Sequence, residues 1–86
     1  MQIFKIPEPV LSRKYQGAGM AIAAVTGGQI VNLVYFRDLD DDVDEDDQAA
    51  LMALIENPRI GPTIRELQAQ GELFVGMCSC TEFIVR

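Results

Sequence analysis

The pair Gly27-Gly28 constrains this chain more than any other feature, because it separates two apolar runs. Two-residue turns of types I′ and II′ require positive φ angles, which glycine adopts without strain. The sequence therefore predicts a β-hairpin over residues 18–37. The turn fixes the register, and on one face it predicts the pairs Thr26–Gln29, Ala24–Val31, Ile22–Leu33 and Met20–Tyr35.

The second face of this hairpin sets small residues against large ones. Its expected pairs are Val25–Ile30, Ala23–Asn32, Ala21–Val34 and Gly19–Phe36. Apolar residues on both faces indicate a central strand pair that is covered on two sides, or a sheet that meets another subunit. We expect Ile30, Val34 and Phe36 to mediate self-association as a homodimer. In the alternative, the N-terminal segment through Pro9 and Leu11 folds over them.

The remaining residues predict further strands and two helices. Residues 2–6 form a short strand, and a helix over 45–56 buries Leu51, Leu54 and Ile55. A second helix begins near Gly61-Pro62, turns Ile64 and Leu67 inward and ends at Gly71. In residues 72–86, Leu73, Val75 and Met77 alternate inward. A bulge near Gly76 or a tight turn at 78–80 would account for the weaker pattern that follows.

This order, β-β-β-α-α-β with room for a fifth strand, predicts an α+β fold. The sheet is small and mainly antiparallel, with two short helices on one face. The length of 86 residues indicates a single domain over 1–86.

Negative charge is concentrated in one segment. The formal net charge is −6, yet eight of the 13 acids fall within residues 38–47. Such a tract cannot be a strand interior, because like charges would face one another across the ladder. We expect it to bind a basic surface on a protein partner, through Asp38, Asp40, Asp41, Asp42, Asp44, Glu45, Asp46 and Asp47. The alternative is a solvated loop that leads into a charged helix start.

The acidic segment does not match a calcium-binding loop. An EF-hand loop that began at Asp38 would have Val43 at the glycine position and Ala49 at the bidentate glutamate position. A loop that began at Asp40 would have Glu45 and Leu51 there. No metal site and no cofactor are therefore expected.

Enzymatic chemistry has little support in the sequence. There is no histidine, the usual general base, and Ser12 and Ser79 have no evident base nearby. Cys78 and Cys80 are two thiols where a structural zinc site needs about four ligands. We expect a protein that is not an enzyme. Direct nucleic-acid binding is disfavoured, because the basic residues are few and scattered.

No apolar run is long enough to span a membrane, and residues 1–10 lack the apolar core of a signal peptide, so we expect a cytoplasmic protein. The leading hypothesis is a small acidic protein-binding module. It could act as an inhibitor that mimics nucleic acid on a basic surface of its partner. Two alternatives stay open: a structural homo-oligomer, and a small-ligand or enzymatic domain whose site is shared between subunits.

Overall fold

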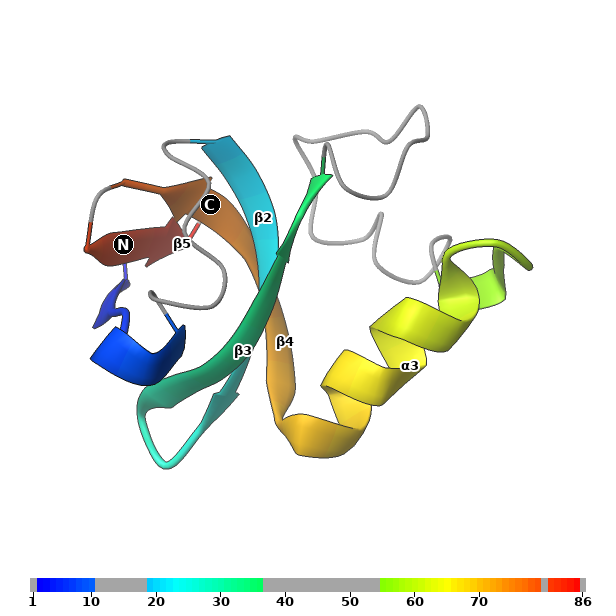
Figure 1. The fold of residues 1–86 in the computed structure, drawn as a ribbon, viewed down its shortest axis with the longest axis horizontal. Helices are drawn as coiled ribbons and strands as arrows, with labels where there is room; N and C mark the ends of the chain where they lie inside the picture. The colour runs from blue at the N-terminus through cyan, green and yellow to red at the C-terminus, as the bar shows by residue number, and fades with distance from the viewer. Residues whose placement is uncertain (1, 11–18, 37–54, 80, 86) are drawn as a thin grey trace.

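The computed structural model describes residues 2–10, 19–36, 55–79 and 81–85 (Figure 1). The α+β fold class is confirmed, and the fifth strand is present. The helix predicted over 45–56 lies outside the described residues, together with Leu51 and Leu54, except that residues 55–56 are helical. The elements are β1 (Ile3–Lys5), β2 (Gly19–Thr26), β3 (Gln29–Tyr35), α3 (Gly61–Gln70), β4 (Glu72–Cys78) and β5 (Glu82–Val85).

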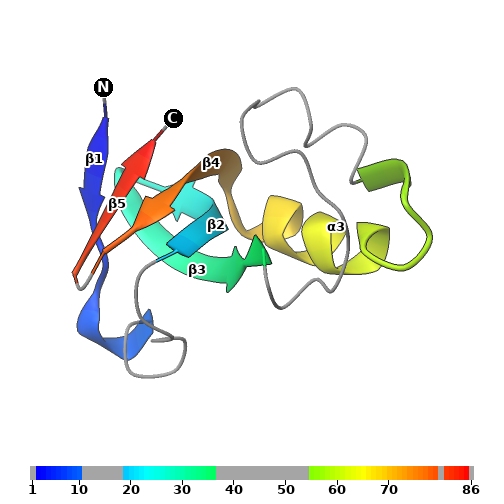
Figure 2. The ribbon, with the colours of Figure 1, turned by 90° about the horizontal axis from the view of Figure 1, so that it is seen from above.

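The five strands form one antiparallel sheet in the order β1-β5-β4-β2-β3. The sheet curls strongly, so that its two edge strands, β1 and β3, come into contact. Figure 2 shows this curl from above, with α3 packed outside it. Different side chains cover the two faces of the sheet, so that each face has its own core.

The predicted hairpin turn is confirmed, but the predicted register holds only beside it. Gly27 and Gly28 have φ angles of 61° and 77°, and the flanking pairs are Thr26–Gln29 and Val25–Ile30. The register then shifts by one residue at a β-bulge, because Val31 has no partner on β2. The predicted pairs Ile22–Leu33 and Met20–Tyr35 are therefore wrong. The observed pairs beyond the bulge are Ala24–Asn32, Ala23–Leu33, Ile22–Val34 and Ala21–Tyr35.

Asn32 supplies a physical reason for the bulge. In the predicted register this side chain would have shared the face of Ala23, which is fully buried. Burial of an amide without partners is costly, about 1–3 kcal/mol in mutational data. The bulge instead leaves Asn32 half-buried, and its Oδ1 accepts a hydrogen bond from the Leu33 amide at 2.9 Å.

One face of the sheet, which we call the inner core, is filled without help from α3. Ala21 and Ala23 make room there for the large side chains of Tyr35 and Leu33. The sheet curls around this core, and the segment after β1 closes it. Its buried residues are Ile6, Val10, Ala21, Ala23, Val25, Ile30, Leu33, Tyr35, Cys78 and Phe83.

The other face packs against α3 and forms the helix-side core. As predicted, Ile64 and Leu67 face inward from α3, where they meet Ile22 and Val75 of the sheet. Figure 1 shows α3 lying obliquely beside β4 and β3. The buried residues of this core are Met20, Ile22, Ala24, Phe36, Ile60, Ile64, Leu67 and Val75.

Two glycines are required by close backbone approach. Gly71 ends α3 as predicted, but its φ of 172° is extended and is not a left-handed cap. A Cβ there would lie 2.6 Å from the Val25 carbonyl oxygen. At Gly76 a Cβ would collide with the Ile84 carbonyl oxygen and lie 2.8 Å from the Phe83 ring. Both glycines therefore let neighbouring segments pack against β4 and the end of α3.

The path of the C-terminal residues follows one of the two predicted alternatives. A tight turn joins β4 to β5, and the Ser79 amide donates to the Glu82 carbonyl at 2.8 Å. Leu73 and Val75 face the helix-side core as predicted. Met77 lies on the same face, opposite Met20, but it is 39% exposed and is not part of that core.

Candidate protein-interaction surface

The eight acids predicted to bind a partner lie outside the described residues. The residues on either side of that part of the chain are described, and both belong to the helix-side core. Phe36 is buried there directly after β3, and Ile55 packs against the same core. The chain therefore leaves the described fold and returns to it on the α3 side of the sheet.

The three residues predicted for self-association do not share one face. Ile30 is 1% exposed in the inner core, whereas Phe36 is 6% exposed in the helix-side core and Val34 packs beside it. The bulge separates them, because it reverses the facing of every residue after Val31. Ile6 and Val10 join the core that contains Ile30, as the alternative of an N-terminal cover expects.

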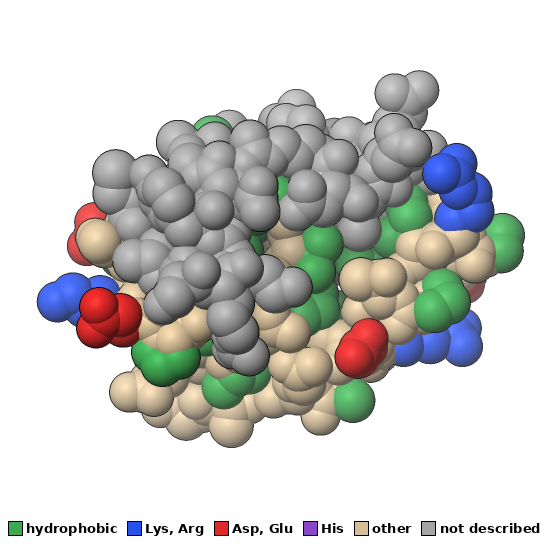
Figure 3. All heavy atoms as spheres, viewed as in Figure 1, with side chains coloured by type: hydrophobic (Ala, Val, Ile, Leu, Met, Phe, Trp, Pro, Cys, Tyr) green, Lys and Arg blue, Asp and Glu red, His purple; other side chains and the backbone are tan. Residues whose placement is uncertain are grey.

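A groove separates the edge of β3 from α3. Its volume is about 130 Å³, and its lining residues are Asn32, Val34, Thr63, Glu66 and Leu67. We call it the β3–α3 groove. Thr63 and Glu66 are exposed on α3, while Leu67 is buried and Val34 half-buried at the base. Figure 3 shows hydrophobic surface between this edge and α3, with an acidic side chain close by.

Sequence reasoning missed this groove, because its residues come from segments about 30 positions apart. One signal was available: Asn32 is the only amide within the apolar run from Ile30 to Phe36. An amide in such a run indicates a sheet edge or a site, since a fully covered position would require compensating hydrogen bonds.

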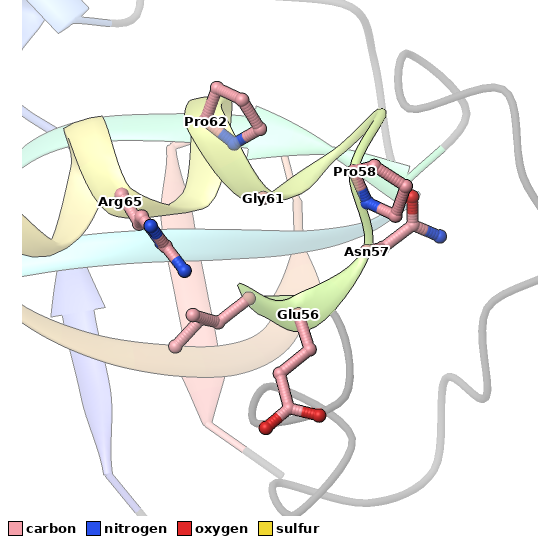
Figure 4. Close-up of a pocket in the computed structure, with 7 residues that line it drawn as sticks. Glu56, Asn57, Pro58, Gly61, Pro62 and Arg65 are labelled. Atoms are coloured by element: carbon pink, nitrogen blue, oxygen red, sulfur yellow. The ribbon is translucent and has the colours of Figure 1, made fainter.

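A larger hollow lies at the start of α3. Its volume is about 310 Å³, and Figure 4 shows Arg65 and Glu56 on opposite sides of it, with the Glu56 carboxylate pointing away from the helix. Asn57 shapes the turn, because its Oδ1 accepts from the Arg59 amide at 2.9 Å and the Ile60 amide at 3.4 Å. The charged groups of Glu56 and Arg65 are both exposed, which favours recognition of a partner over chemistry in a desolvated site.

An apolar row crosses the sheet on the same face as the helix-side core, but beyond the reach of α3. Cross-strand pairing places Ile3 beside Ile84, and Ile84 beside Met77. Ile3 is 54% exposed and Met77 is 39% exposed. We call Ile3, Met77 and Ile84 the outer row. Such a row is a surface that a partner can cover.

Cys78 is a buried residue of the inner core and presents no reactive thiol. Burial raises the pKa of the Cys78 thiol, and a hydrogen bond with Tyr35 opposes that shift to a smaller extent. The thiolate is the nucleophile and the metal ligand, so a raised pKa disfavours both roles. Cys80, the other predicted thiol, lies outside the described residues.

No protein-family model matches this chain, and neither does any curated protein. In the described ranges, no three side chains of the types that bind metals lie together. Nor is any helix in those ranges long and apolar enough to cross a membrane. Charge and surface are therefore the features of this chain that point to a function.

Proposed function

We propose that this protein is a small acidic binding module that recognises a basic surface on a partner protein and performs no catalysis itself. The observation that carries this function is the density of charge, with eight carboxylates in ten consecutive residues. Carboxylates this close repel one another, which destabilises the free protein. A surface rich in arginine and lysine would relieve that repulsion and add charge-assisted hydrogen bonds.

Two features of the described fold support this function. Phe36 and Ile55, the described residues that flank this part of the chain, both pack in the helix-side core. Every acidic side chain in the described residues is exposed, as are Lys5, Arg59 and Arg65. The charged side chains thus lie at the surface, where a partner can reach them, and the core is built of apolar side chains.

In its more specific form, the module is an inhibitor. A row of carboxylates can occupy a basic surface that otherwise holds the phosphates of nucleic acid, since both ligands are recognised by arginine and lysine. Such an inhibitor binds its partner protein and leaves free nucleic acid alone.

An affinity capture tests this function. The protein is immobilised, incubated with cell extract at low and at physiological salt, and the retained proteins are identified by mass spectrometry. We expect basic proteins whose retention falls as salt rises, because exposed charges are screened. For an inhibitor, added DNA or RNA competes for the captured protein. Retention that salt does not change would contradict a charge-driven module.

A second role, self-association, is favoured by the outer row. Ile3, Met77 and Ile84 form a continuous apolar stripe at one end of the sheet, and a second copy of the chain could cover it. Sedimentation of wild type and of Met77→Lys, each at micromolar concentration, tests this role. A dimer that the variant abolishes supports it, and a monomer of 9.5 kDa for both proteins contradicts it.

A further inference from the structure

The β3–α3 groove lies beside the open edge of the sheet. Within the described residues, β3 pairs with β2 on one side and is hydrogen-bonded to no strand on the other, although β1 comes into contact with it. The amides and carbonyls on such an edge can pair with an added strand. One amide at this position, that of Leu33, donates a hydrogen bond to the neighbouring Asn32 side chain, with 2.9 Å between Leu33 N and Asn32 Oδ1. A carbonyl of a ligand could replace that side chain.

Building on the proposed function, we propose that the β3–α3 groove binds an extended basic segment of the partner protein, which adds a strand to the edge of β3. Strand addition gains affinity from main-chain hydrogen bonds, and pockets for alternate side chains give it specificity. Here the hollow over Val34 and Leu67 is the pocket, and α3 is the wall that holds the added strand in place.

The lining of the groove selects the chemistry of the occupant. Its base is apolar, so one side chain of the added strand is aliphatic. Among the lining residues that the structure describes, the charged one is Glu66, which is exposed at the wall and has Thr63 one helical turn before it. Alternate side chains of a strand point to opposite faces. An aliphatic residue at the base thus leaves its neighbours at the rim, where arginine or lysine can approach Glu66.

Nuclear magnetic resonance titration tests this site with defined probes. The ligand is a capped peptide of alternating arginine and valine, added to the isotopically labelled full chain. We expect shifts of the Leu33 and Val34 amides and of the α3 amides around Glu66. A second peptide, N-methylated at alternate amides, keeps every side chain but cannot pair as a strand. We expect it to bind about tenfold or more weakly, because several net hydrogen bonds are lost.

Two matched variants separate the groove from the general acidity of the chain. Glu66→Gln removes the groove carboxylate, and Glu82→Gln removes one exposed charge on β5. We expect only Glu66→Gln to weaken the peptide, by about two- to fivefold, the range of an exposed ion pair. Equal effects of the two variants would contradict a specific role for Glu66.

Equal affinity for the methylated and unmethylated peptides would overturn strand addition. Shifts confined to residues 38–47 would overturn the groove as the site and leave the proposed function standing. A failure of the proposed function is seen separately, as the absence of any salt-sensitive basic partner in the affinity capture.

Discussion

Ala23 of β2 lies opposite Leu33 of β3, one residue out of step with the pairing that the Gly27-Gly28 turn alone would give. The unpaired Val31 produces this shift. It places Leu33 and Tyr35 in the inner core, above two alanines that leave space for them. It also places Val34 and Phe36 on the side of α3. One extra residue thus decides which side chains of β3 face α3.

Deletion of Val31 should leave the observed pairing intact. Without that residue Asn32 follows Ile30 directly, so Leu33 still falls opposite Ala23 and the two cores keep their members. Insertion of an alanine after Val31 is the matched control, because Leu33 then either reverses its facing or, if the bulge is lost, slides two residues along β2, and in both cases it no longer lies opposite Ala23. Cross-strand nuclear Overhauser effects report the pairing. Loss of the Ala23–Leu33 effect in the deletion would contradict this assignment.

The sequence could predict the hairpin but not the bulge within it. The turn depends on the φ angles of Gly27 and Gly28, a local property that their residue type reveals. The bulge depends on the fit of side chains across two strands and on the position of Asn32 at the edge. These are tertiary properties, and an apolar run such as residues 30–36 fits either register. The helix at Gly61 was predictable for the same local reason, since proline in the first turn favours its start.

Gly76→Ala should destabilise the fold by about 1–3 kcal/mol, the usual range for overpacking. The new methyl group would meet the Ile84 carbonyl oxygen and the Phe83 ring. Gly19→Ala is the matched control in β2, because its methyl group would lie 3.8 Å from the Tyr35 ring in ordinary contact. Urea denaturation measures both variants. Similar stability of the two proteins would contradict the close packing of β4 on β5.

Ile30→Ala should lower the free energy of unfolding by about 2–5 kcal/mol, as expected for a buried isoleucine. Val31→Ala, at the exposed bulge next to it, should change the stability by less than about 0.5 kcal/mol. Denaturation measures the loss, and sedimentation shows whether the oligomeric mass changes. A stable Ile30→Ala protein with altered mass would show that Ile30 belongs to a subunit interface and not to the inner core.

The Cys78 thiol should make the fold less stable in alkali. Its pKa is raised above the ordinary 9.0 by burial, so the unfolded chain releases this proton before the folded one does. The free energy of unfolding should therefore be fully retained below pH 9.0 and fall above it, by at most about 1.4 kcal/mol per pH unit. Denaturation of wild type and Cys78→Ala across this range isolates the contribution. Parallel pH profiles would contradict the shift.

The candidate surface was only partly predictable. Charge density is a property of composition, so the sequence alone identifies the acidic segment. The groove needs Val34 beside Leu67, and the outer row needs Ile3 beside Ile84 and Met77. These contacts depend on the strand order and on the curl of the sheet, which place together residues that are distant in the chain.

The most direct test of a charge-driven binding module compares two variants of equal net charge. One changes Asp40, Asp41 and Asp42 to asparagine. The other changes Glu8, Glu72 and Glu82, all exposed in the described fold, to glutamine. Each is titrated against the captured partner at low and at physiological salt. We predict that the asparagine variant loses about tenfold in affinity at low salt, as three exposed ion pairs would give, while the glutamine variant binds like wild type. Equal affinities of wild type and the asparagine variant would contradict a charge-driven binding module.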